Sequence, residues 1–178
     1  MTTKIKSDIL KIGWYQIVGG CFGALVILYS LYSPKQVSGY EVLVYIFILL
    51  FFGYSIFCGT LCIKHKDNAL TYSVINQFLQ LIGFSILGLA FTYVAGFYIS
   101  IGLEFSTTVK AKFECGLSAF NLKLNRGYDI IEIHFNLIAF GLIYWILNLS
   151  TKIEAGNRIQ QTLDKEINSN ENCKIPDA

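Results

Sequence analysis

The sequence predicts an all-α integral membrane protein, a bundle of four transmembrane helices with a small extracytoplasmic β-hairpin between helices 3 and 4. Three observations predict this fold. The chain is 54% hydrophobic and only 15% charged, which is too apolar for a soluble domain of 178 residues. Four stretches lack Asp, Glu, Lys and Arg over roughly the 20 residues that a helix needs to cross a bilayer. The segment before the last stretch alternates in the manner of paired strands.

The four uncharged stretches define the expected spans, which cover about residues 12–32, 42–63, 78–101 and 132–150. Helix is expected in each of them, because a lipid-embedded segment must satisfy its own backbone donors and acceptors. We expect a single domain over residues 1–168, with an outer loop at 103–131 and a disordered, polar cytoplasmic tail at 169–178.

The first span follows Lys4, Lys6 and Lys11, which is the arrangement found in a signal peptide. Its end, Tyr29-Ser30-Leu31-Tyr32, lacks the small-x-small pattern that a signal peptidase requires. We therefore expect an uncleaved first helix.

The distribution of basic residues predicts the orientation. Of the 14 Lys and Arg, nine fall on the N-terminal side of the expected spans and five on the other side. Since positively charged segments stay inside, both termini are expected in the cytoplasm, in a multi-pass protein of the cell inner (cytoplasmic) membrane. The pairs Trp14-Tyr15 and Tyr144-Trp145 then fall at the same inner interface, where aromatic rings are favoured.

The third uncharged run is longer than a span requires. It extends from Ala69 to Leu103, 35 residues, and a straight helix of that length would reach roughly 50 Å. We expect its first turns to lie in the inner headgroup zone, or the helix to tilt or bend near a glycine.

A polar face marks the first half of this run. Ser73, Asn76, Gln77 and Gln80 recur at three- and four-residue spacing and therefore share one side of a helix. Carboxamides are costly toward lipid, so this face must meet protein, water or a ligand. Two interpretations remain open: hydrogen bonds between helices, or the wall of a cavity for a substrate, an ion or a partner segment.

Small residues at four-residue spacing predict close helix packing. Gly19 and Gly23 form one such strip on the first span, and Thr92, Gly96 and Ser100 form another on the third. Homo-oligomerisation is the further possibility that these strips leave open.

The outer loop contains two alternating segments, Thr107–Phe113 and Ala119–Leu124, around Cys115-Gly116. This pattern predicts the small hairpin. A lone hairpin is marginal in water, so helix ends or another subunit must cover its apolar side.

Several classes of function are disfavoured. The net charge of +2 gives no field for nucleic acid. Cys58, Cys62 and His65 share a helix face, but the other histidine, His134, is expected a bilayer away, so we expect no metal. No nucleotide or hydrolase motif occurs, so we expect neither a cofactor nor an enzyme.

The leading hypothesis is a non-enzymatic membrane scaffold or accessory subunit in the lipid bilayer, either a homo-oligomer or bound to a protein partner. It would dock through the outer hairpin and a cytoplasmic extension of the fourth helix. The alternative is a small channel or transporter lined by the polar face of helix 3. In length and number of expected spans the chain also resembles small four-pass accessory membrane proteins encoded beside bacterial defence systems such as Kiwa or type VI-B CRISPR. That resemblance implies an accessory role in anti-phage defence.

Overall fold

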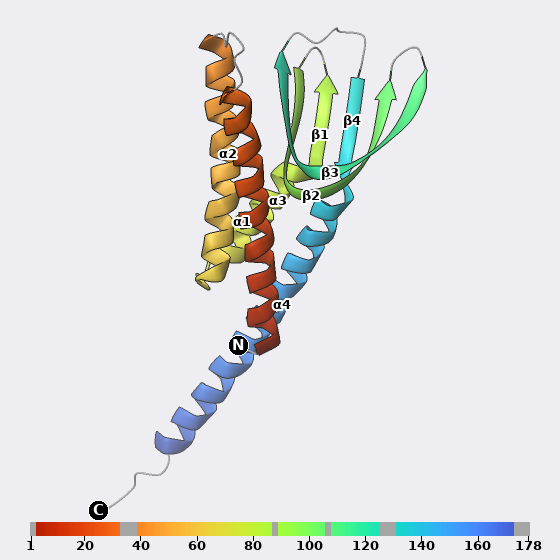
Figure 1. The fold of residues 1–178 in the computed structure, drawn as a ribbon. Coiled ribbons are helices and arrows are strands. Elements are labelled where there is room, and N and C mark those ends of the chain that lie inside the picture. The colour runs from red at the N-terminus through yellow and green to blue at the C-terminus, as the bar shows by residue number, and fades with distance from the viewer. Residues whose placement is uncertain (1–2, 33–38, 87–88, 106–107, 125–130, 173–178) are drawn as a thin grey trace, which may run out of the picture.

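The computed structural model describes residues 3–32, 39–86, 89–105, 108–124 and 131–172. In these ranges two long helices stand beside an antiparallel sheet, and the two other helices lie below it (Figure 1). In chain order the elements are α1 (Thr3–Tyr32), α2 (Gly39–Ile63), α3 (Ala69–Leu81), β1 (Ile82–Ile86), β2 (Leu89–Phe105), β3 (Val109–Leu124), β4 (Ile131–Asn136) and α4 (Leu137–Asn172).

The predicted four-helix bundle is wrong. Three helices, Thr3–Tyr32, Val42–Ile63 and Leu137–Ile167, are long and apolar enough to cross a membrane. The expected third span, 78–101, contains only the end of α3 and continues as β1 and most of β2. The expected fourth span, 132–150, begins in β4 and becomes helical at Leu137. In place of a small hairpin, the structure has a four-stranded sheet.

The error has a physical reason. In β1 and the second half of β2, large apolar residues alternate with Gly and Ser, as in Ile99-Ser100-Ile101-Gly102-Leu103, and a charged residue follows only at Glu104. This alternation fits a strand, because successive side chains point to opposite faces of a sheet. The mean hydropathy of the segment does not reveal this alternation, because small and hydroxyl residues lower the mean only slightly. The segment 169–178, expected to be disordered, begins within α4, and its last six residues lie outside the described ranges.

The sheet is strongly curved. Its strand order is β1-β4-β2-β3, with an additional pairing of β1 with β2. The start of β2 pairs with β1 and the end of β2 pairs with β4, while β1 and β4 also pair with each other. This is possible because β2 bends at an irregularity between Val94 and Phe97, where Gly96 has a φ of +115°. β3 follows β2 around the bend, so the sheet forms a cup (Figure 1).

The helices pack through glycines. A Cβ atom on Gly59 of α2 would lie 2.5 Å from the carbonyl oxygen of Gly13 on α1, so the two backbones are in direct contact. At the end opposite the sheet, Ile9 and Ile12 of α1 pack with Ile146 and Leu149 of α4. The charged part of α4 projects beyond this contact (Figure 1).

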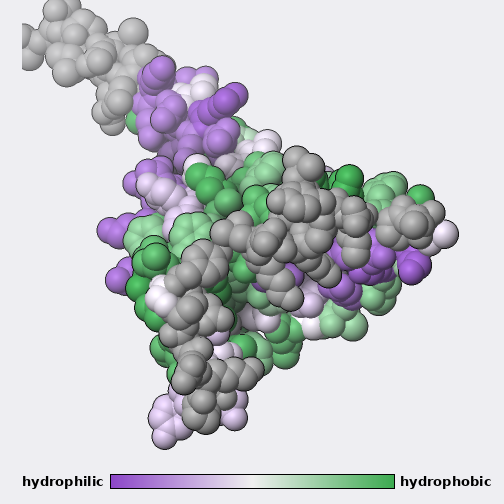
Figure 2. All heavy atoms as spheres, turned by 90° about the horizontal axis from the view of Figure 1, so that it is seen from above, coloured by the Kyte–Doolittle hydropathy of each residue, from purple (hydrophilic) through white to green (hydrophobic). Residues whose placement is uncertain are grey.

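The cup lies alongside the apolar parts of α1 and α2. Tyr93 and Ala95 of β2 share a core with Ile48 and Phe52 of α2, and Ala24 of α1 packs against it. On its outer side the cup exposes large apolar residues, among them Ile101, Leu103, Phe105, Val109, Phe113, Leu117, Ile131, Ile133 and Phe135. Seen from the sheet end, Figure 2 shows hydrophobic atoms along the flanks and hydrophilic atoms on the projecting part of α4.

Candidate functional site

The polar face of α3 lies inside the protein. Ser73, Asn76, Gln77 and Gln80 are each at most 2% exposed. They are joined there by Gln16 of α1 and Ser55 of α2, which are also fully buried. We refer to this buried set, together with Ser100 of β2 and Asn136 of β4, as the polar column.

Asn76 is the hub of the column. Its amide nitrogen lies 3.3 Å from Gln16 Oε1 and 3.1 Å from Ser55 Oγ, so it donates hydrogen bonds to α1 and to α2. Its amide oxygen lies 3.3 Å from the hydroxyl of Tyr93, which is also 2.8 Å from the carbonyl oxygen of Phe51. One side chain therefore connects α1, α2, α3 and the sheet.

Gln80 connects the column to the sheet. Its Oε1 accepts a hydrogen bond of 2.9 Å from the backbone N–H of Ala95 at the bend of β2. Its backbone carbonyl accepts a 3.3 Å bond from the amide of Asn136, whose own oxygen accepts from the N–H groups of Ile138 and Ala139 at the start of α4. Asn136 thus caps α4 and fixes the point where β4 becomes helical.

A pocket of about 490 Å³, the base pocket, lies at the end of the column away from the sheet. It is formed by residues 65–71 around the turn into α3, by Ile9, and by Ser150, Ile153, Glu154 and Asn157 of α4. Between it and Asn76 stands Ser73, whose Oγ lies 3.1 Å from the Sγ of the buried Cys62.

A second cavity, the sheet cavity of about 220 Å³, occupies the concave side of the cup. Lys112 forms ion pairs there with Glu104 and with Glu132, the latter at 2.7 Å, and His134 Nε2 lies 3.6 Å from the other oxygen of Glu132. The side chain of Glu132 is only 7% exposed. Lys112 donates hydrogen bonds to the carboxylates of Glu104 and Glu132, which raises the pKa of its ammonium group and keeps it cationic.

A small cavity of about 20 Å³ lies between the sheet cavity and the column. Gln80, Ser100 and Asn136 line it from the column, and Glu114 and His134 line it from the cavity. Polar groups therefore continue from the concave side of the sheet, through α3, to the base pocket.

The buried polar atoms without a partner lie on this route. Within the described ranges they are Gln16 Nε2, Gln77 Nε2, Gln77 Oε1, Gln80 Nε2, Ser100 Oγ and His134 Nδ1. Folded proteins pair the great majority of such atoms with protein or ordered water. In the column, therefore, several amides and hydroxyls of the lining are not satisfied by protein groups.

Of the two predicted packing strips, the first lies on a helix and the second does not. Gly19 lies against Gly96, and Ser118 Oγ bridges them, 2.9 Å from the carbonyl oxygen of Gly19 and 3.0 Å from the N–H of Gly96. Gly23 lies against the ring of Phe52. The second strip is not on a helix, which corrects that expectation: Thr92, on β2 with Gly96 and Ser100, lines the sheet cavity.

Sequence reasoning missed Gln16, Ser55 and the charged group of the sheet cavity. Gln16 and Ser55 each had a weak signal, a single polar residue within a long apolar helix. Glu132 and His134 fall at the start of the expected fourth span, 132–150, and their pairing with Lys112 depends on the sheet register.

Comparison with protein-family models, with curated proteins and with solved structures finds no match for this chain. The resemblance to four-pass defence proteins depended on the number of spans, and the described part of the chain has three helices that could span a membrane. The site must therefore be interpreted from its own geometry.

Proposed function

We propose that this protein is a small membrane channel or transporter whose pathway is the polar column. The observation that carries this proposal is the line of unpartnered buried polar atoms on Gln16, Gln77, Gln80, Ser100 and His134. A cavity lies at each end of that line.

A purely structural interface would pair its amides, as Asn76 does. A buried amide group without a partner costs roughly 1–3 kcal/mol, and Gln77 leaves both of its polar side-chain atoms unpaired. Water in the column would satisfy these atoms, and the cavity of about 20 Å³ is large enough for one water molecule. The pattern therefore supports a hydrated pathway better than a dry packing surface.

The lining favours protons carried by water. The cavity of about 20 Å³ has amides and hydroxyls among its lining groups and has room for about one water molecule. At its sheet end, Glu132 and His134 lie within 3.6 Å of each other and supply groups that can accept and release a proton.

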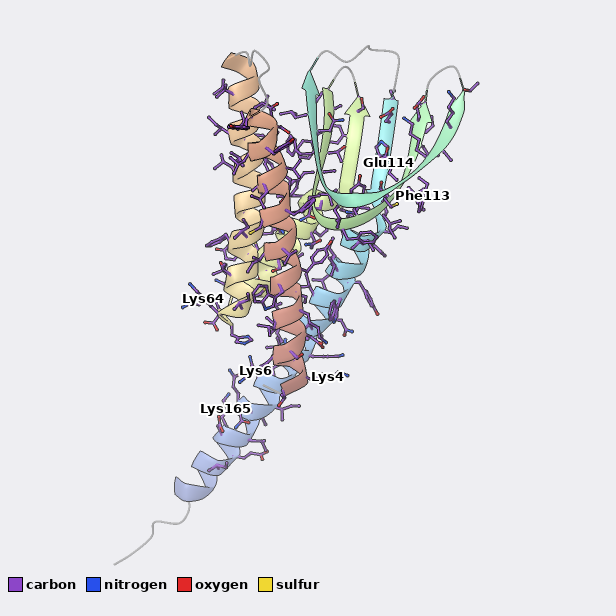
Figure 3. All side chains as sticks on the ribbon, in the orientation of Figure 1. Lys4, Lys6, Lys64, Phe113, Glu114 and Lys165 are labelled. Atoms are coloured by element: carbon purple, nitrogen blue, oxygen red, sulfur yellow. The ribbon has the colours of Figure 1, made fainter. Side chains whose placement is uncertain are left out.

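The placement of charge supports a membrane orientation with the base pocket in the cytoplasm. Figure 3 shows Lys4, Lys6, Lys64 and Lys165 at the end of the molecule opposite the sheet. Positive residues concentrate on the cytoplasmic side of membrane proteins. In this orientation both termini face the cytoplasm of a cell whose inner membrane holds α1, α2 and α4.

Proton flux into proteoliposomes tests the pathway. With an internal pH-sensitive dye and a potassium diffusion potential, the wild-type protein is expected to acidify the lumen, and Gln77→Met is expected to reduce the rate at least tenfold. Methionine keeps the length of the side chain and removes only the polar atoms, neither of which has a protein partner. The folded fraction, measured by thermal melting in detergent, is expected to stay at the wild-type level.

The matched control is Gln161→Met, the same substitution on the exposed part of α4. It is expected to leave the flux unchanged. A wild-type protein that conducts neither protons nor potassium nor sodium would refute the proposal, and so would a folded Gln77→Met variant with full flux.

A second candidate function is a non-enzymatic scaffold or accessory subunit that docks a protein partner. It is favoured by the projecting part of α4, where Ile159, Leu163 and Ile167 are exposed at four-residue spacing. If α4 docks a partner, a protein truncated after Arg158 is expected to lose that partner in co-purification and to keep its proton flux, because the residues of α4 that line the base pocket end at Asn157. Retention of the partner by the truncated protein would contradict docking through α4.

A further inference from the structure

One long edge of the sheet has no neighbour in the described structure. β3 pairs with β2 along its whole length, and among the described strands none pairs with its other side. Near the bend, Ser118 contacts α1 through Gly19. Leu117 and Ser118 still border α1. The part of β3 on the N-terminal side of Leu117 leads away from the helices to the rim of the cup (Figure 1).

The surroundings of this edge are apolar. Val109, Phe113 and Leu117 point to the outer face, and Phe113 is 68% exposed. The cup packs beside parts of α1 and α2 that belong to the candidate spans, so the outer face lies at the depth of the bilayer. Backbone N–H and C=O groups cannot stay unpaired there, since hydrocarbon offers no hydrogen bonds. The edge therefore requires a protein partner.

We propose that the partner is the same edge of a second copy of this chain, paired antiparallel about a two-fold axis at Phe113. Two identical edges related by a two-fold axis must run antiparallel, and each then supplies the hydrogen bonds that the other lacks. In this register Phe113 faces Phe113, and Lys112 of each copy faces Glu114 of the other. On the outer side, Ala111 faces Cys115.

Charge complementarity selects this register over its neighbours. A shift by one residue would place apolar side chains of one copy opposite charged side chains of the other, on the wrong face. An axis at Lys112 would set Lys112 opposite Lys112, and an axis at Glu114 would set Glu114 opposite Glu114. Like charges directly opposite each other destabilise a pair of strands. The axis at Lys112 also sets Lys110 opposite Glu114 twice, but only with a like-charged pair at its centre. The axis at Phe113 sets Lys112 opposite Glu114 twice with no like-charged pair, and brings each Glu114 to an ammonium group that already binds Glu104 and Glu132 of its own copy.

The side-chain directions agree with this arrangement. Figure 3 shows Glu114 on the concave side of the sheet, and this residue lines the sheet cavity, whereas Phe113 points away from it. Pairing therefore joins the concave sides of two cups, so that the polar side chains face a shared interior and the apolar ones face lipid. This inference does not depend on the proposed conduction, because it follows from the edge and its surroundings.

Cysteine cross-linking of the full chain in native membranes tests the register. Residues directly opposite on antiparallel strands have Cα atoms about 4.5–5.5 Å apart, within the range of a disulfide. Under mild oxidation, Ala111→Cys is expected to form a dimer through the native Cys115. The double variant Ala111→Cys, Cys115→Ser is expected to stay monomeric on a denaturing gel. Phe113→Cys in the Cys115→Ser background is expected to form a dimer with itself.

Leu103→Cys in the Cys115→Ser background is the control, since Leu103 lies on the same outer face but on β2. It is expected to give no dimer. Absence of dimers from both Ala111→Cys and Phe113→Cys would overturn the proposal, and so would equal cross-linking of Leu103→Cys. A dimer from the Ala111→Cys, Cys115→Ser variant would place the axis elsewhere and overturn this register. None of these outcomes alters the expected flux of the wild-type protein.

Discussion

Asn76→Leu is expected to destabilise the protein by about 2 kcal/mol, seen as a lower melting temperature in detergent. The variant loses the contacts of Asn76 with Gln16, Ser55 and Tyr93, and interhelical hydrogen bonds in membrane proteins contribute on average about 0.6 kcal/mol each. Leucine is also larger than asparagine and enters a site with no exposed surface, which adds overpacking.

The hydrogen-bond partners of Asn76 are not affected equally by the substitution. Ser55 and Tyr93 keep backbone carbonyl partners at 3.1 Å and 2.8 Å, but Gln16 Oε1 loses its donor, and Gln16 Nε2 is already unpaired. Adding Gln16→Met to Asn76→Leu is therefore expected to recover part of the lost stability, because a buried amide without partners is removed. Strictly additive losses in this double-mutant cycle would show that the two amides do not interact.

The polar face of α3 is a feature that helical period alone reveals. Ser73, Asn76, Gln77 and Gln80 repeat every three or four residues, so their common direction follows from geometry without any knowledge of the neighbours. The structure places all four in the interior. Their partners Gln16 and Ser55 were not predicted, because a single polar residue in an apolar helix defines no face.

The sheet was not predicted because membrane spans are assigned from average hydropathy, which does not register the alternation of side chains along a strand. The uncharged run from Ala69 was too long for one helix, and its excess was assigned to tilt or bending. The chain instead changes from helix to strand at Ile82, where Gly, Ser and Thr carry the alternation. The charged group of the sheet cavity depends on this change, since Lys112 and Glu132 meet only through the pairing of β2 with both β3 and β4.

Among the helix contacts, the glycine contact between α1 and α2 is expected to tolerate an added side chain least. Gly59→Leu is expected to lower the melting temperature in detergent strongly, with a loss of about 3 kcal/mol or more and little folded protein recovered. The reason is steric: a Cβ on residue 59 would lie 2.5 Å from the carbonyl oxygen of Gly13 and 3.1 Å from the backbone nitrogen of Ile17. Backbone atoms cannot move aside as a flexible side chain can.

Gly53→Leu provides the matched control, because Gly53 lies on the same helix and a Cβ there would meet nothing within 4 Å. Both variants add the same side chain and change helix propensity equally, so the difference between their melting temperatures isolates the close approach of the two backbones. Equal melting temperatures for the two would mean that α1 and α2 do not touch at Gly13. The structure of the polar column would then also be in question, since the Ser55 hydroxyl reaches the backbone carbonyl of Gln16 only while the two helices are in contact.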